Sequence, residues 1–476
     1  MNTERGIEIA RKHLICTVAA ALVLPVSLYG QNMKTKVDLV VTGTIVTMND
    51  SRAIYQHGAV AVRADSIVAV GPEAEIQGLY EARETINAQG KPVLPGFING
   101  HTHVPMSLFR GLHADDVTLD YWLQKYIFPA EAKNVNEEFV RWGTRLALAE
   151  QIRAGVTTYA DMYYFEDAVA EETKAAGMRG VLSEAFVDFP APDNKSEAST
   201  LAYTEKFLQK WQGDPLIHAA VAPHSIYTCS QKTLQDSAAL ARKYHAPILI
   251  HLSETKKEND DSFAKNGASP TQYLDRIGVL GPDVVAAHCI YVDEADRKVL
   301  ANRQVGCVHN PSSNMMLASG VAPVPQLRSA GVAVGLGTDG PAGSNNDFDL
   351  MEEIDLAAKL AKIANMDPLA LNSKAVVEMA TIDGARALHM DKEIGSLEKG
   401  KKADLIVISL DAPNAVPIYD IYTQLAYTLK ASDVETVVIG GQVVMRDRHL
   451  MTINEAATIA KARQYGKAVA ESLGIQ

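Results

Sequence analysis

The sequence predicts an α/β protein, a (β/α)8 barrel of the TIM type that carries a small β-sandwich built from both ends of the chain. Three observations indicate this architecture. Alternating apolar patterns occur near both termini, eight short apolar runs fill the middle of the chain, and helix-like stretches separate those runs. A length of 476 residues suits one large domain with a smaller accessory unit.

The first 30 residues have the pattern of a secretory signal peptide. Basic residues precede an apolar run over residues 14–30, and polar sequence begins at Gln31. A charged start followed by a short apolar stretch is typical of export signals. The run is short for a bilayer span and Pro25 interrupts it, so we expect cleavage, an exported protein and no stable membrane span. An uncleaved anchor, or a misassigned start codon upstream of a cytosolic enzyme, are the alternatives.

Alternating apolar runs flank the middle of the chain. Apolar and polar residues alternate over residues 37–48 and 59–71, and Gly and Asp turn signals interrupt the two runs, as in antiparallel strands. A similar pattern returns near the C-terminus. The two ends therefore predict one small sheet domain. The predicted domain limits are 36–95 plus 396–450 for the sandwich, 96–395 for the barrel and 451–476 for a C-terminal helix.

Eight apolar runs in the middle have the continuous character of parallel strands buried on both faces. Helix-like stretches such as residues 135–155 follow them, and eight such β-then-α units close into a barrel. The predicted strands lie within residues 91–103, 155–162, 179–188, 217–225, 247–255, 284–290, 305–310 and 332–340.

Polar residues gather where these runs end, which is where barrel enzymes carry their chemistry. Random placement would scatter such groups over helices and loops. The residues at the predicted strand ends are His101, His103, Asp161, Glu184, His224, His251, Glu254, His288, His309 and Asp339.

Four of these residues form a candidate metal site. His101 and His103 are two apart at the end of an extended segment, so both rings can face one ion. His251 closes a strongly apolar run, and Asp339 follows the glycine-rich run of residues 332–338. Each residue alone is more often a hydrogen-bonded core group. Together they offer three neutral nitrogens and one carboxylate, a set that suits zinc or another borderline divalent ion with one position open for water.

Net charge narrows the classes of partner, and the number and context of the cysteines bear on disulfides. The formal net charge is −12, with acidic and basic residues interspersed, which argues against nucleic acid because a phosphate backbone calls for a basic face. The net charge says nothing about a small-molecule partner, and a homo-oligomer is compatible with the sequence. Cys229, Cys289 and Cys307 lie in or beside apolar strand-like runs, so we expect buried thiols rather than a bridge.

Several motifs resemble those of the amidohydrolase superfamily. They are PGFINGHTH (95–103), HLSET (251–255), AHC (287–289), HNPSSN (309–314) and GTDG (337–340). Within the superfamily they are similar to the branch of methylthioadenosine and S-adenosylhomocysteine deaminases, with the related aminohydrolases and triazine chlorohydrolases. The likeness covers nearly the whole chain after the signal, including residues 395–407.

The resemblance implies hydrolytic deamination of an adenine nucleoside or a similar amino-heterocycle by metal-activated water. Glu254 would serve the ring nitrogen as an acid, since the matching residue does so in the resembling deaminases. His288 would orient and polarise the water. Asp339, besides binding the ion, would take the proton of the water and pass it to departing ammonia, which requires one oxygen free of the metal.

The number of metal ions follows from a missing residue. Dinuclear members of the superfamily bridge two ions with a carboxylated lysine at a strand end, whereas the fourth predicted strand here ends in Pro-His-Ser. We therefore expect one divalent ion per chain, zinc, with iron as the alternative.

The resemblance also indicates substrate contacts. It points to Trp122 and Glu131 in the segment after the first strand, and to His224, because the matching Glu and His hold the sugar hydroxyls of a nucleoside. Trp122 could stack on a base, although core packing is an even alternative for it. Glu254 would contact the ring itself.

Two departures bear on the substrate. Relatives that bind an amino-acid carboxylate have an arginine at the end of the third strand and another in the loop that follows. This chain has Glu184 at that strand end, where we expect a substrate contact, and residues 188–200 contain no arginine. Met316 stands where relatives commonly have lysine. These differences put S-adenosylhomocysteine in doubt.

Three other functions stay open at this point. One is hydrolytic displacement of chloride or an alkylamine from a triazine-like ring, and another is deamination of guanine or cytosine. The third is an exported binding protein that has lost its activity, which the intact set of polar strand-end residues argues against.

Overall fold

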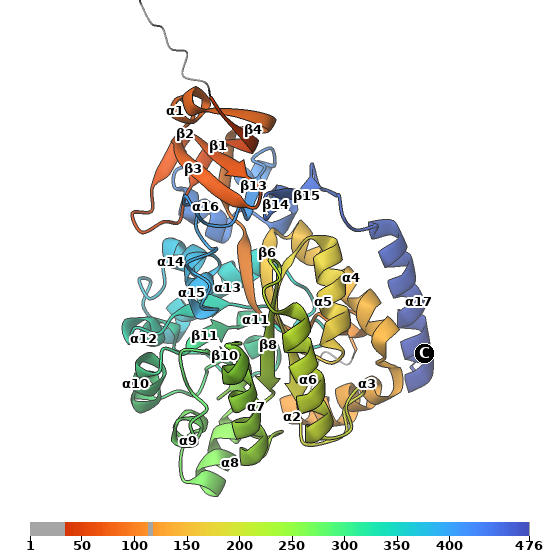
Figure 1. The fold of residues 1–476 in the computed structure, drawn as a ribbon. Coiled ribbons are helices and arrows are strands. Elements are labelled where there is room, and N and C mark those ends of the chain that lie inside the picture. Colours follow the sequence, from red (N-terminus) through yellow and green to blue (C-terminus); the bar gives the residue numbers. More distant parts are fainter. Residues whose placement is uncertain (1–33, 113–117, 476) are drawn as a thin grey trace, which may run out of the picture.

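The structure is a computed structural model that describes residues 34–112 and 118–475 (Figure 1). The predicted signal peptide lies outside the described residues. Within the described part, no helix combines the length and apolar character needed to cross a membrane.

Eight parallel strands form a closed barrel, as the sequence predicted. Their order around the barrel follows the chain, and every residue of the strands at 156–163 and 179–186 is buried, which explains their continuous apolar runs. The barrel strands are β5 (Phe97–Thr102), β6 (Val156–Tyr163), β7 (Arg179–Phe186), β8 (Ile217–Pro223), β9 (Ile248–Leu252), β10 (Val284–His288), β11 (Gly306–His309) and β12 (Val334–Leu336).

Helices connect the strands and surround the barrel (Figure 1). Several begin at side-chain caps, such as Ser196 and Asp293, each of which forms a capping box. The helices of this part are η1 (Val104–Phe109), α2 (Leu119–Trp122), η2 (Leu123–Ile127), α3 (Phe128–Asn134), α4 (Glu137–Arg153), α5 (Glu166–Ala176), α6 (Glu197–Trp211), α7 (Gln231–Tyr244), α8 (Lys256–Asn266), α9 (Pro270–Arg276), α10 (Glu294–Asn302), α11 (Pro311–Met316), α12 (Val324–Ser329), α13 (Leu350–Asn365), α14 (Ser373–Met379) and α15 (Ile382–Ala387).

Strands from both chain ends form a second, mixed sheet. Hydrogen bonds join its strands in the order β16-β15-β14-β13-β4-β1-β2-β3, and apolar side chains from its two halves share one core cluster. The two chain ends, predicted to form a small sandwich, are therefore joined in a single hydrogen-bonded sheet. Its elements are β1 (Thr35–Val46), β2 (Ile54–Arg63), β3 (Ser66–Pro72), α1 (Glu73–Leu79), β4 (Tyr80–Pro95), β13 (Leu405–Ile408), η3 (Pro413–Ala415), α16 (Ile421–Tyr427), η4 (Ala431–Asp433), β14 (Val434–Ile439), β15 (Gln442–Arg446) and β16 (His449–Leu450).

Two details of this sheet differ from the expectation. The pair β1–β4 is parallel, whereas the other paired strands of the sheet are antiparallel. The run at 91–103, expected as one barrel strand, divides at Gly96, so its first part belongs to β4 and its second part to β5. A side chain at Gly96 would be 2.1 Å from Thr157, so the chain passes the barrel closely at the point of division.

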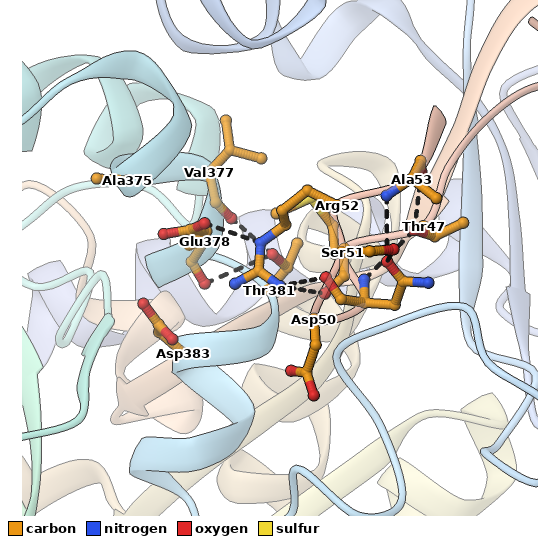
Figure 2. Close-up of polar contacts among 12 residues, drawn as sticks. Thr47, Asp50, Ser51, Arg52, Ala53, Ala375, Val377, Glu378, Thr381 and Asp383 are labelled. Carbon is orange, nitrogen blue, oxygen red and sulfur yellow. Dashed lines mark hydrogen bonds and ion pairs between the residues drawn. The ribbon is translucent and has the colours of Figure 1, made fainter. Parts of the chain in front are cut away.

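Ion pairs fasten the sheet to the barrel. In Figure 2, Arg52 of the β1–β2 turn reaches Glu378 of α14, with Nε 2.8 Å from Oε1. Arg179, the first residue of β7, donates two hydrogen bonds to Asp404 of the sheet at 2.9 and 3.1 Å, and both side chains are buried. Asp404 also accepts the backbone N–H of Gly96 through its carbonyl oxygen. The sheet therefore contacts the end of the barrel where strands begin and leaves the opposite end free for a site.

A last helix and three cysteines complete the described fold. Helix α17 (Glu455–Leu473) closes the chain and packs on the barrel, with the rings of Tyr465 and Phe139 5.5 Å apart. Cys229, Cys289 and Cys307 are buried free thiols.

Candidate active site

The four predicted metal ligands converge at the end of the barrel where strands finish. Rings of His101 and His103 are 4.9 Å apart between centroids, and those of His101 and His251 are 4.8 Å apart. Asp339, just after β12, has Oδ1 3.4 Å from Nε2 of His101 and 3.3 Å from Nε2 of His103. Ligand atoms of His101, His103 and His251 all lie within 4.8 Å of one another, as do those of His101, His288 and Asp339.

A local irregularity of β5 brings His101 to this site. The register between β5 and β6 shifts between Asn99 and Thr102, which marks a bulge. Bulges beside active sites re-aim side chains that regular alternation would send elsewhere.

Backbone carbonyls orient two of the histidines. Nδ1 of His103 lies 2.6 Å from the carbonyl oxygen of Met162, and Nδ1 of His251 lies 2.9 Å from that of His224. Each carbonyl can only accept, so each Nδ1 carries a proton, which leaves Nε2 as the nitrogen that can bind a cation. This arrangement is common among metal-binding histidines.

Charges within the set also fit a divalent cation. Burial lowers the pKa of His101 to about 4, so its ring is neutral, and its buried Nε2 has no hydrogen-bond partner. Burial alone would raise the pKa of Asp339, but the nearby imidazoles of His101 and His103 outweigh it and hold that pKa well below its ordinary value. Burial likewise opposes a rise in the pKa of His103, yet Asp339 raises it to about 9. A cation binding here would displace that proton. Three nitrogens and one ionised carboxylate form a zinc-type donor set.

Glu254 and His288 lie beside this set. Oε2 of Glu254 is 3.8 Å from Nε2 of His288, which is 3.9 Å from Oδ2 of Asp339. Burial, and then the charge of Asp339, raise the pKa of Glu254 to about 8, so its carboxyl is protonated at neutral pH. His288 and Asp339 have left-handed backbones, with φ of 73° and 64°. Such conformations cost energy and persist where the surroundings enforce them.

Two adjoining cavities lie at this end of the barrel. We call the first the inner pocket, a cavity of about 60 Å³ whose walls include His103, His251, Glu254, His288 and Asp339. The second, the vestibule, is a cavity of about 1070 Å³. The residues that line both are Leu119, Leu123, Phe128, Glu131, Tyr164 and Tyr227.

Four of the five predicted substrate contacts line the inner pocket, namely Trp122, Glu131, His224 and Glu254. The Nε1 atom of Trp122 is buried without a hydrogen-bond partner. Burial raises the pKa of Glu131 to about 7 against the effect of Tyr163, whose hydroxyl donates to it at 2.7 Å. Burial lowers the pKa of His224 to about 3, so this ring is neutral.

The placement of Glu184 argues against its predicted substrate contact. Its side chain is fully buried and does not line either cavity. Val181 and Ala185 point toward the barrel interior, so the two-residue period of β7 turns Glu184 to the opposite face. There it accepts hydrogen bonds from the backbone of Glu166 and from Asn194, and burial followed by Asp193 raises its pKa well above the ordinary value. A carboxyl buried on this face, away from both cavities, does not contact a substrate.

Several residues that support the site were not assigned a role from the sequence. Glu258 accepts the backbone N–H groups of Ser253 and Glu254 and so fixes the turn after β9. Asp161 accepts from Thr102 and from the backbone of Val104, on either side of His103. Asp161 ends a predicted strand, which was a usable signal, whereas Glu258 lies inside a helix and carried none.

Comparisons with known proteins agree with this site. The model of the amidohydrolase family matches residues 93–444. A 5-methylthioadenosine/S-adenosylhomocysteine deaminase from Syntrophobacter fumaroxidans is 46% identical over 431 residues, which cover 90% of this chain and 98% of the relative. Another from Syntrophus aciditrophicus is 44% identical over 435 residues, which cover 91% and 98%.

Solved structures give the same result. A zinc-bound adenosine deaminase from Xanthomonas campestris superposes with a TM-score of 0.89 at 36% sequence identity. The superposition covers 92% of this chain and 100% of the deaminase. An atrazine chlorohydrolase from Arthrobacter aurescens, complexed with zinc, has a TM-score of 0.84 at 22% identity, covering 90% and 100%, and shows the shared fold. The fold, the matched family model and the relatives together show that this chain belongs to the amidohydrolase family.

Proposed function

We propose that this protein is a metal-dependent aminohydrolase that releases ammonia from an adenine nucleoside. The observation that carries the proposal is the meeting of Glu254, His288 and Asp339 at one inner pocket, beside a histidine set that fits a divalent ion. The relatives named as deaminases of adenine nucleosides support the choice of reaction.

One divalent ion per chain, zinc, with iron as the alternative, suits this pocket. His101, His103, His251 and Asp339 would hold it. Among the described residues that line the inner pocket there is no lysine that could bridge a second ion. The chemistry supplied by such an ion is Lewis acidity, which makes water acidic enough to react near neutral pH.

The side chains account for the proton transfers of the reaction. Asp339 takes one proton from the water while the oxygen bonds to the ring carbon, and Glu254 gives its proton to the adjacent ring nitrogen. Asp339 then protonates the amine, the carbon–nitrogen bond breaks and ammonia leaves. Glu254 recovers a proton from the new hydroxyl, which becomes the carbonyl of the product. His288 orients the water throughout.

The sugar and base contacts follow from the walls of the inner pocket. Glu131 and His224 can accept hydrogen bonds from sugar hydroxyls, since the first is a carboxyl group and the second a neutral imidazole. Trp122 offers a flat apolar face for the base. The vestibule is wide enough to receive a group attached to the sugar.

A substrate screen tests the proposal. Purified protein loaded with zinc is assayed for ammonia release from adenosine, methylthioadenosine, S-adenosylhomocysteine, guanine and cytosine, and for chloride release from triazines. We expect an adenine nucleoside to give the highest kcat/KM. A triazine or a free base turning over faster would overturn the assignment.

We also propose that residues 1–30 direct export and are removed. The charged start and the apolar run support this. Mass spectrometry of native protein should find a mature chain beginning near Gln31 outside the cytosol. Intact peptides from residues 2–25 would contradict it.

A further inference from the structure

Helix α11 lies between the two residues to which the mechanism assigns the water. Its Ser313 and Asn314 are almost completely buried, at 0% and 1% exposure. The Ser313 hydroxyl donates to Oδ2 of Asp339 at 2.7 Å, and Oδ1 of Asn314 lies 3.0 Å from Nδ1 of His288. One helical turn therefore contacts both groups.

Contacts around Asp339 separate its two oxygens. Oδ1 faces His101 and His103 and accepts the backbone N–H of Gly340. Oδ2 faces away from these histidines, toward Ser313 and toward Nε2 of His288, which is 3.9 Å away. A carboxylate that binds an ion and also carries a proton needs such a division, and the Ser313 hydroxyl fixes the rotation that creates it.

Asn314 bears on which nitrogen of His288 carries the proton. The oxygen of the Asn314 amide is the nearer partner of Nδ1, and it can only accept, so Nδ1 is the protonated nitrogen. The Nδ2 atom of Asn310 also lies 3.3 Å from Nδ1, and that of Asn314 lies 3.4 Å from Nδ1 of His309. With the proton on Nδ1, Nε2 presents a lone pair to the space between Glu254 and Asp339, where it can accept from water.

Further hydrogen bonds fix the position of α11 relative to Asp339. Glu353 of α13, itself fully buried, accepts the backbone N–H of Ser312 at 3.0 Å and the side-chain amide of Asn345 at 3.1 Å. Asn345 also donates to the carbonyl oxygen of Thr338. The helix and the loop around Asp339 are thus both hydrogen-bonded to one carboxyl group, which fixes their relative position.

We infer that α11 is a positioning element for the reaction: Ser313 reserves Oδ2 of Asp339 for the proton, and Asn314 keeps the proton of His288 on Nδ1. Ser313 and Asn314 do not line the inner pocket, so they act through Asp339 and His288. The inference rests on the proposed function for the identity of the reaction, but the protonation of His288 is measurable without any substrate.

The first test is spectroscopic. Two-bond proton–nitrogen spectra of zinc-loaded protein labelled with nitrogen-15 histidine report which nitrogen of each ring is protonated, and a His288→Gln sample assigns the signal. We expect the proton of His288 on Nδ1 in the wild type. A proton on Nε2 would overturn the role of Asn314, whatever the substrate proves to be.

The second test compares two substitutions of Asn314. In Asn314→Leu the acceptor is lost, so kcat should fall at least ~100-fold while KM stays within about 3-fold. In Asn314→Asp the carboxylate still accepts from Nδ1, so kcat should remain within about tenfold of the wild type. Met315→Ala, on the exposed side of the same helix, is the matched control and should leave kcat unchanged. Full activity of Asn314→Leu, or equal damage in both Asn314 variants, would contradict the inference.

The third test addresses Asp339. Ser313→Ala should lower kcat about tenfold, the typical effect of one hydrogen bond to a charged group, and leave one metal ion per chain. Metal content is measured on the purified protein without substrate. Loss of the metal would show that Ser313 does not separate the two oxygens, and unchanged kcat would show that it does not position Oδ2. If the wild type deaminates no nucleoside, the proposed function fails, while the spectra and the metal content still decide the inference.

Discussion

The strand ends of the barrel and the segments that connect them differ in how far sequence determines their geometry. His101, His251 and Asp339 lie more than 80 residues apart in the chain from one to the next, yet their ligand atoms meet. In contrast, Glu131 lies in a connecting helix, α3, and reaches the inner pocket through an arrangement of α2, η2 and α3 that no periodicity indicates. Closure of a barrel brings strand ends into one ring, whereas connecting segments are placed by their own packing.

This difference has a functional consequence. In the proposed mechanism the strand ends supply the reacting groups, and the connecting segments line the cavities that would receive the rest of the substrate. Substitutions in the ring should therefore abolish the reaction for every substrate. Substitutions in the walls should change KM or the order of substrates.

The largest effect is expected at the metal ligands. His251→Ala and Asp339→Ala should each abolish measurable activity and lower bound metal below one equivalent, because a four-ligand site loses a quarter of its donors. Elemental analysis and ammonia release measure the two effects. His57→Ala, an exposed histidine of β2 in the terminal sheet, is the control and should change neither. Two ions per chain in the wild type would contradict the single-ion site.

Glu254 comes next, as a strand-end residue that does not bind the ion. Glu254→Gln should retain metal and fold but lose at least ~100-fold in kcat, since positioned proton transfer typically contributes that much. Glu294→Gln, an exposed change at the start of α10, controls for the loss of one carboxylate. Activity within a few-fold of the wild type would make Glu254 a structural residue.

Most of the ring, but not all of it, was accessible from sequence. The eight runs and the clustering of the candidate ligands were predicted because buried parallel strands leave continuous apolar runs and because His and Asp at their ends stand out. Glu184 was predicted as a substrate contact from its place at a strand end, without asking which face of the strand it lies on. Val181 and Ala185 face the barrel interior, so the alternation of the strand places Glu184 on the outer face. The positions of Ser313 and Asn314 relative to Asp339 and His288 depend on packing between β11, α11 and β12, which leaves no local pattern.

The pH dependence should report Glu254. Its carboxyl has a pKa raised to about 8, so it is protonated below that pH and ionised above it. Only the protonated form can donate, so kcat/KM should be fully present below pH about 8 and fall about tenfold per unit above it. In Glu254→Gln this alkaline decline should disappear from the residual rate. Its persistence would assign the decline to another group.

The walls should give smaller and more selective effects. Glu131→Gln removes a charge-capable acceptor for a sugar hydroxyl and should raise KM for a nucleoside about tenfold, the effect of one hydrogen bond to a charged group. Because Glu131 does not touch the reacting carbon in this mechanism, kcat should change by less than about 3-fold. Steady-state kinetics separate the two. A large fall in kcat with unchanged KM would move Glu131 into the chemical machinery.

The smallest effect concerns the group attached to the sugar, and the vestibule decides it. Binding a carboxylate there would require a free cation, for which arginine is best suited. Among the described residues, no arginine lines the vestibule. Its lysines are engaged: Lys195 donates to the carbonyl oxygens of Ala191 and Pro192, while Lys256 and Lys257 pair with Asp260 and Asp261. Glu184 takes no part in this preference, because it does not line the vestibule and the lysines of the described wall are already paired.

We therefore expect a neutral adenine nucleoside to be preferred over S-adenosylhomocysteine by at least ~10-fold in kcat/KM, about 1.4 kcal/mol of transition-state binding. Phe189, at the vestibule wall with its ring 5.1 Å from that of Phe128, is the position to change. Phe189→Arg should shift the preference toward the carboxylate-bearing substrate, whereas Phe189→Leu, which removes the ring without adding charge, should not. Competition assays on substrate mixtures measure the ratio directly. Equal turnover of both substrates by the wild type would mean that Lys195 leaves its carbonyl partners to bind the carboxylate, and Lys195→Ala would then lower the rate for that substrate alone.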